Sequence, residues 1–261
     1  MRALKIAATG MSAQQMRVET ISNNLANMNT TGYNARRVEF SDLHYQQLSR
    51  AGTVNAADGT VLPTGIQLGL GVRPAAVTVH LNQGALSATG NDLDLAIEGT
   101  GYLEVTLPSG RSAFTRDGSL KRSPEGMIVT SDGFPVSPEI VIPPDARSIS
   151  INGAGEVHAY FIDNAEGQIL GQLTLAGFTN AKGLEALGGN LFAETEASGP
   201  PLVSAPGQDG LGTLRQGYIE DSSVDAVREV TELIEAQRGY EMNAKVISAV
   251  DQMMGATTQV R

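Results

Sequence analysis

Cysteine and tryptophan are both absent from the 261 residues of this chain, which contains only 6 tyrosines and 6 phenylalanines. The lack of cysteine excludes disulfides, thiolate metal sites and cysteine nucleophiles. The chain also lacks an uninterrupted apolar run of the about 18 residues that a transmembrane helix needs. Its first residues include Arg2 and Lys5, but no continuous apolar stretch of the length that a secretory signal needs precedes Gln14. We therefore expect no membrane insertion and no cleaved signal peptide.

Basic residues are also scarce, because 18 Lys and Arg stand against 28 Asp and Glu. The net charge of -10 argues against a nucleic-acid partner, since neutralising phosphates requires a basic face. A hydrophobic content of 41% is ordinary for a folded protein, and the length allows one or two folded units.

Catalytic and metal-binding patterns are missing as well. His44, His80 and His158 lie far apart without the spacing of metal ligands. Asp92 and Asp94 are not followed by the glycine and glutamate of a calcium loop. Phosphate-binding, dinucleotide-binding and nucleophile-elbow motifs do not occur. We therefore predict no catalytic residue, no metal site and no cofactor, and a protein that is not an enzyme.

The first 32 residues are predicted to form a long helix. Its residues at alternating spacings of three and four form one stripe, which only Gln14 interrupts. Polar and glycine residues from Asn27 to Gly32 end the pattern. The stripe consists of Leu4, Ala7, Met11, Gln14, Val18, Ile21, Leu25 and Met28.

Residues 222–261 repeat this pattern at the other end. Ser222 and Asp225 match a Ser-x-x-Asp capping box, so we expect the helix to begin there. The apolar stripe again follows alternating spacings of three and four. It consists of Val230, Leu233, Gln237, Tyr240, Ala244, Ile247, Asp251 and Met254.

The middle of the chain is predicted to be mainly β. Alternating residues from Tyr102 to Leu107, a turn at 108–110 and a second run to Thr115 indicate a hairpin. Asp-Gly and Glu-Gly pairs separate further short runs. Residues 46–71 and 194–212 have little periodicity. The predicted fold is α+β, with an extended segment 33–75, a β domain 76–200 and a return linker 201–221 between the two helices.

Each terminal helix exposes an apolar stripe unless something covers it. In one interpretation the two helices pair only with each other, beside the β domain. In the other, they also contact helices of neighbouring subunits. Small residues in the first turns, such as Ala7, Ala8 and Gly10, and Gly239 in the second helix favour close packing of several helices. A head-to-tail interface that does not close generates a helical filament.

Two segments resemble the signatures of flagellar basal-body rod and hook proteins. Residues 21–33, ISNNLANMNTTGY, are similar to the N-terminal signature, together with residues 10–15. Residues 219–225 and 236–241 are similar to the C-terminal one, although Gly239 stands where alanine is usual. Residues 3–7, 40–46 and 62–72 resemble the distal-rod branch most, whereas residues 89–102 are shared with proximal-rod and hook relatives.

The resemblance implies a structural subunit of the distal rod, which transmits torque from motor to hook. It implies terminal helices that pair as a coiled-coil core around a channel, and an extra segment at 46–71 that packs between subunits and stiffens the rod. The implied axial core and intersubunit residues are Leu4, Ala7, Met11, Val18, Ile21, Asn24, Leu25, Asn27, Val230, Leu233, Gln237, Arg238, Tyr240, Ile247 and Met254.

The implied partners are further copies of the chain, proximal-rod, hook or hook–rod junction subunits, the periplasmic and outer-membrane ring proteins, and the flagellar export apparatus. The implied location is the rod of the basal body, which spans the periplasm. Three alternatives remain: another axial subunit such as a proximal-rod or hook protein, a peripheral binding module on a helical stalk, and a hydrolase with an unrecognised site.

Overall fold

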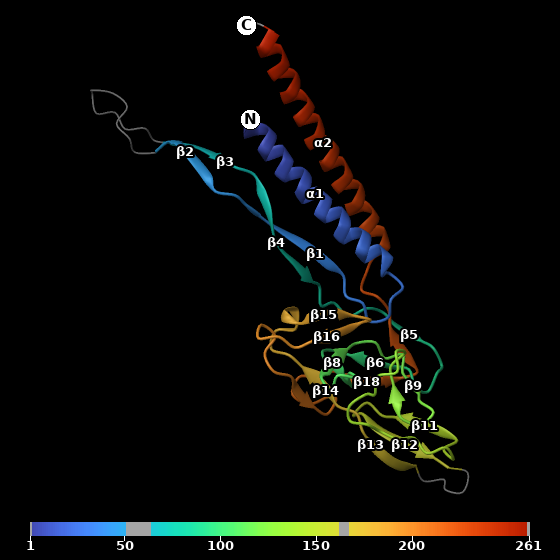
Figure 1. The fold of residues 1–261 in the computed structure, drawn as a ribbon. Helices are drawn as coiled ribbons and strands as arrows, with labels where there is room; N and C mark the ends of the chain where they lie inside the picture. Colours follow the sequence, from blue (N-terminus) through green and yellow to red (C-terminus); the bar gives the residue numbers. More distant parts are fainter. Residues whose placement is uncertain (1, 51–63, 162–166, 260–261) are drawn as a thin grey trace. The chain divides into compact units, whose positions relative to one another are not determined.

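The computed structural model describes residues 2–50, 64–161 and 167–259, which form two compact units (Figure 1). The helical unit contains the described residues of 1–25, 36–78 and 225–261. The central unit contains those of 26–35 and 79–224. A helix lies at each end of the chain and strands dominate between them, which confirms the predicted α+β class.

The helical unit contains two long helices, α1 (Arg2–Ala26) and α2 (Ala226–Gln259). Helix α1 ends before residue 32, the predicted boundary, because Asn27 accepts a hydrogen bond from the Thr30 amide at its carbonyl and one from the Thr30 hydroxyl at its side chain. Within the described residues, neither helix is apolar over a stretch long enough to cross a bilayer.

The predicted start of the second helix at Ser222 was wrong. Helix α2 is capped by Asp225, whose Oδ1 accepts hydrogen bonds from the amides of Val227 and Arg228. The hydroxyl of Ser222 instead accepts a hydrogen bond from the Val224 amide in the preceding turn. A Ser-x-x-Asp sequence contains two possible capping residues, and here the second one is used.

A two-stranded ribbon completes the helical unit, in a segment predicted to be extended. Its inner half pairs β1 (Arg36–Asp42) with β4 (Val72–Val79), and its outer half pairs β2 (Tyr45–Ser49) antiparallel with β3 (Ile66–Gly69). The outer strands are exposed on both faces, and each is short: β3 alternates Ile66 and Leu68 over only 4 residues, and β2 has no such alternation, so the segment was predicted only as extended. The region around Asn55, within the predicted stiffening segment, lies outside the described residues, as do Leu62 and Pro63.

The central unit is built from short antiparallel strands. The expected hairpin is confirmed: β7 (Tyr102–Thr106) pairs with β8 (Ser112–Thr115) through a turn at residues 107–111. They lie in the middle of a six-stranded sheet, in the order β15 (Glu185–Gly188), β16 (Leu191–Ala193), β8, β7, β14 (Leu175–Gly177) and β17 (Leu202–Ser204).

Smaller sheets complete the central unit. Strands β18 (Thr213–Gln216) and β19 (Tyr218–Glu220), in the predicted linker, return to pair with β6 (Leu95–Glu98) and β5 (Leu86–Ala88). The remaining elements are β9 (Lys121–Arg122), β10 (Ile128–Val129), β11 (Ser148–Ile151), β12 (Glu156–Tyr160), β13 (Gln168–Gln172) and the short 3-10 helix η1 (Ala181–Gly183).

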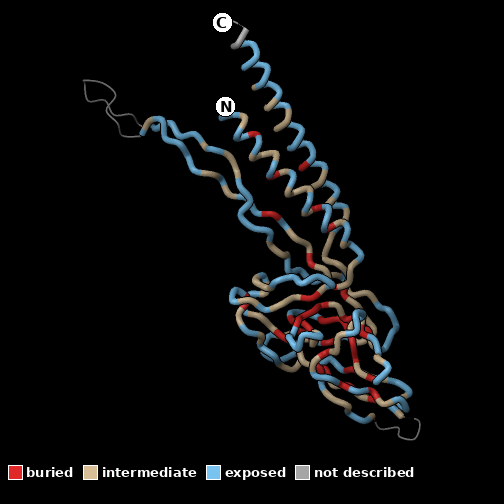
Figure 2. The backbone as a smooth tube through the Cα atoms, in the orientation of Figure 1, coloured by how far each residue is buried: buried red, intermediate tan, exposed pale blue. Residues whose placement is uncertain are grey.

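The hydrophobic core lies almost wholly in the central unit. Figure 2 shows its buried segments gathered there, while the two helices carry only isolated buried positions. The largest fully buried side chains all come from this unit: Phe114, Leu95, Ile97, Leu103, Leu120, Ile128, Ile142, Leu173, Leu175, Val105, Val136 and Val157. The helical unit therefore folds with little apolar burial of its own.

Gly32 offers a test of the central unit's packing. It has a φ of +65°, and a Cβ there would lie 3.0 Å from backbone atoms of Arg116. We expect Gly32→Ala to destabilise the central unit by more than the about 1–2 kcal/mol that the left-handed conformation alone costs. Gly110→Ala is the matched control, because Gly110 has a φ of +76° and nothing within 4 Å of its Cβ position.

Urea unfolding followed by far-UV circular dichroism measures both costs. Equal losses of stability for the two variants would show that the contact with Arg116 is unimportant.

Candidate assembly interface

The two helices pair in antiparallel order through small and polar residues. A Cβ on Gly10 would lie 3.0 Å from the Asn243 side chain, and one on Gly239 would lie 3.1 Å from Gln14. Arg17 forms ion pairs with Glu232 at 3.4 Å and Glu235 at 3.5 Å across the same contact. Glycines let the helix axes approach closely at these positions. Because the groups in contact are largely polar, they contribute little hydrophobic stabilisation.

The axial-core residues predicted in the N-terminal segment are partly covered. Ala7, Ile21 and Asn24 are buried. The others are half-buried: Leu4, Met11, Val18, Leu25 and Asn27.

The predicted residues of α2 mostly point outward. Leu233 and Ile247 are half-buried, whereas the other five are exposed: Val230, Gln237, Arg238, Tyr240 and Met254. The contact with α1 uses positions just N-terminal to the stripe, such as Ala236, which is fully buried, and Gly239. Small side chains at these positions permit close approach, which Gln237 and Tyr240 would prevent. The stripe itself therefore stays available on the outside of the pair.

Several large apolar side chains of α2 are exposed, between charged residues such as Arg238 and Lys245. Val227 is 78% exposed and Met242 63% exposed, although both lie in a regular helix. A run of large apolar side chains open to water is unusual for a monomer and typical of an interaction surface. We use the name α2 apolar face for these exposed apolar side chains, which alternate with polar residues on the part of α2 that does not contact α1: Val227, Val230, Ile234, Tyr240, Met242 and Val246.

Asn24 joins three elements of the helical unit. Its Nδ2 donates to the Arg36 carbonyl at 2.8 Å and to Glu229 Oε2 at 3.2 Å, and its Oδ1 accepts a hydrogen bond from the Arg36 amide at 2.9 Å. The side chain thus links α1, the start of β1 and the first turns of α2. Burial raises the pKa of the Glu229 carboxyl, although the hydrogen bond from Asn24 opposes this shift.

Arg116 performs a similar task in the central unit, and the sequence reasoning missed it. Its side chain is 9% exposed and forms an ion pair with Glu220 at 2.7 Å, while its guanidinium also donates to the carbonyls of Gly99 and Gly101. The Glu220 carbonyl accepts a hydrogen bond from the Gly32 amide. Segments of both sequence signatures are therefore fixed around one buried ion pair. In the sequence, Arg116 is a single basic residue before the Asp117-Gly118 turn, and no pattern around it indicates a buried ion pair.

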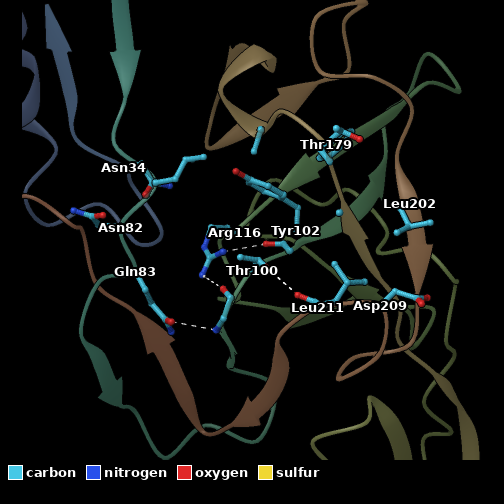
Figure 3. A pocket seen from close by; sticks show the side chains of 17 residues that line it. Asn34, Asn82, Gln83, Thr100, Tyr102, Arg116, Thr179, Leu202, Asp209 and Leu211 are labelled. Carbon is cyan, nitrogen blue, oxygen red and sulfur yellow. Dashed lines mark hydrogen bonds between the residues drawn. The ribbon is translucent and has the colours of Figure 1, made fainter.

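A cavity of about 590 Å³ opens beside Arg116 (Figure 3). Gln83 lines the cavity; its side chain donates a hydrogen bond to the Ile97 carbonyl and accepts one from the Gly99 amide. Burial raises the pKa of the Tyr102 hydroxyl, which lines the cavity. Because Arg116 and Gln83 already bind the protein's own backbone and Glu220, they serve to hold the chain together. In the described part of the chain, no three His, Asp or Glu side chains are grouped to hold a metal.

A helix at each end of the chain and a β-rich middle are the architecture expected of a flagellar rod or hook subunit, and comparison with known protein families agrees. Three family models match: "Flagella basal body rod protein" at residues 4–34, "Flagellar hook protein FlgE/F/G D1 domain" at 96–159, and "Flagellar basal body rod FlgEFG protein C-terminal" at 215–260. They cover both terminal segments and part of the central unit.

Individual relatives narrow the family. The chain is 51% identical to the flagellar basal-body rod protein FlgG of Caulobacter vibrioides, over 100% of both chains. It is 44% identical to FlgG of Borreliella burgdorferi, over 100% of this chain and 99% of the relative. A flagellar hook-basal body complex protein of Bacillus subtilis, FlhP, is 32% identical over both whole chains. The chain belongs to the FlgG family of flagellar basal-body rod proteins, which are structural proteins and not enzymes.

The buried ion pair gives a prediction for the central unit. Arg116→Met should destabilise it by about 3–5 kcal/mol, because Glu220 is left buried without a cation. The double variant Arg116→Met/Glu220→Leu should lose less than the two single variants together, because no unpaired charge remains. Arg111→Met, at an exposed position, is the control. Urea unfolding of the natural protein, Arg116→Met, Glu220→Leu and the double variant measures the coupling energy between the two residues. Strictly additive losses of stability would contradict the dependence of each residue on the other.

Proposed function

We propose that this chain is a subunit of the distal part of the flagellar rod, where copies polymerise helically into a hollow shaft that transmits torque to the hook. The α2 apolar face supports this proposal most directly, because it leaves large apolar side chains exposed in a folded subunit. Each Val, Ile or Met side chain that a neighbour buries fully contributes about 1.5–3 kcal/mol. Repeating such a contact head to tail produces a filament.

In this proposal the paired helices form the coiled-coil core of the shaft. The heptad spacing on α2 supports this arrangement, since residues repeating every 3.5 positions keep a seam facing a neighbouring helix. The core residues are those predicted from the sequence, with Val230 and Tyr240 contacting other subunits and Ala7 and Ile21 lying within the pair. The exposed ribbon β2–β3 packs between subunits and stiffens the shaft.

The proposed partners follow from the same position in the flagellum. Proximal-rod subunits lie below and hook or hook–rod junction subunits above, while the rings of the periplasm and outer membrane surround the shaft. The chain passes through the flagellar export apparatus without a cleaved signal. Long helices with few buried residues suit this route, because they gain most of their stability from packing after export.

The α2 apolar face gives a direct prediction for assembly. Val230→Glu should abolish polymerisation while the subunit stays folded, because a charge would be buried between subunits. Ile169→Glu is the matched control, since Ile169 is an exposed apolar residue on β13 of the central unit. Sedimentation and electron microscopy of the purified proteins give the outcome. Filaments formed equally well by Val230→Glu would exclude this face from the assembly contact.

The position within the rod is tested in the motile host. We expect deletion of the gene to leave basal bodies with short rods and inner rings, but without outer rings or hook, as seen by electron microscopy. The alternative function is that of a proximal-rod or hook-type subunit. Complete rods that lack only the hook would favour a hook-type subunit, and normal flagella would contradict any structural role.

A further inference from the structure

The ribbon of the helical unit bends at one defined place. Strands β1 and β4 stop, and β2 and β3 begin, where the Leu43 amide donates to the Gly71 carbonyl at 2.8 Å. Gly71 has a φ of +122°, which side chains other than hydrogen rarely permit. The inner and outer halves of the ribbon therefore meet at a glycine whose conformation fixes the change of direction.

Thr9 of α1 contacts this bend. Its hydroxyl donates to the Ile6 carbonyl at 2.7 Å and accepts a hydrogen bond from the Val72 amide at 3.3 Å. A Cβ on Gly71 would collide with the same hydroxyl oxygen, so the ribbon backbone and the helix are in direct contact. The amide of Val72 thus finds its acceptor on the helix.

A second contact holds the start of the ribbon, since Asn24 binds both backbone groups of Arg36. The spacing between the two contacts is similar along the helix and along the strand. From Thr9 to Asn24 the helix rises roughly 22 Å, and from Arg36 to Leu43 a strand extends about 23 Å. In Figure 1 the inner half of the ribbon runs alongside α1. Helix α1 therefore supports the inner ribbon at both of its ends.

We propose that Thr9 and Gly71 form a latch that fixes the bend of the ribbon against α1 and so sets the direction of the outer strands β2 and β3. These strands present Tyr45, Leu48 and Ile66 to solvent, each more than half exposed. A two-stranded hairpin alone is marginally stable in water, so its direction depends on what holds its base. The latch rests on the proposed function of the chain, because it positions the ribbon that packs between subunits.

The purified full chain tests the latch by hydrogen exchange at the Val72 amide. Thr9→Val keeps the shape of the side chain but removes the acceptor, and should accelerate exchange about tenfold, in line with the loss of one hydrogen bond. Thr9→Ser keeps the hydroxyl and should exchange like the natural protein. Thr20→Val is the control, because Thr20 also donates to a carbonyl of its own helix, that of Met16. Unchanged exchange in Thr9→Val would overturn the latch.

Gly71→Ala tests the same contact from the ribbon. The added methyl group should displace the ribbon from Thr9 and accelerate exchange at Val72, while far-UV circular dichroism reports unchanged helix content. If Gly71→Ala exchanges at the natural rate, the close approach to Thr9 does not hold the bend, which also overturns the latch.

Rods purified from the host then test its role in assembly. We expect rods of Thr9→Val to be more curved than natural rods or those of Thr9→Ser in electron micrographs. Rods that stay equally straight although Val72 exchanges faster would overturn the positioning role and leave the helical polymer standing. If the natural chain is absent from rods altogether, the proposed function fails instead, whatever the exchange rates show.

Discussion

The α2 apolar face is the constraint on which the helical unit depends, because the described residues of the helix pair leave its side chains between 43% and 78% exposed. The pair is joined by Gly10, Gln14 and Gly239, with Arg17 bridging to two glutamates, so its contact is polar and close. The contact between the helices therefore contributes little hydrophobic stabilisation, and the large apolar side chains of α2 lie mostly outside it. In the proposed assembly the helical unit, unlike the central unit, gains its largest apolar burial only when copies meet, which suits a protein that is exported before it polymerises.

Polar side chains hold distant segments of the chain in place within each unit. In the central unit, the buried pair of Arg116 and Glu220 fixes strands from distant parts of the sequence, and its desolvation is offset by hydrogen bonds to backbone carbonyls. In the helical unit, Asn24 satisfies both backbone groups of Arg36. The signature segments thus contain polar side chains, such as Asn24 and Glu220, whose hydrogen bonds and ion pairs hold other segments of the chain in place.

The sequence predicted the class of fold, the two helices and the β7–β8 hairpin, because each has an apolar period or a turn that acts locally. It did not predict the β2–β3 ribbon, since β2 has no apolar alternation and that of β3 extends over only 4 residues. The cap of α2 was assigned to Ser222 instead of Asp225 because both residues have suitable oxygens. Arg116 was missed because its partner Glu220 lies far away in the sequence, and only the fold brings them together. The intersubunit residues stay a prediction, as one chain contains no neighbour.

Hydrogen exchange of the free subunit and of assembled rods compares the two states most directly. The amides of α1 and α2 should be markedly less protected in the free subunit than in rods, because neighbours add to their stability in the proposed assembly, whereas the core strands of the central unit should be equally protected in both. If the amides of α1 and α2 are as strongly protected in the free subunit as in rods, the helical unit does not depend on assembly and the account is contradicted.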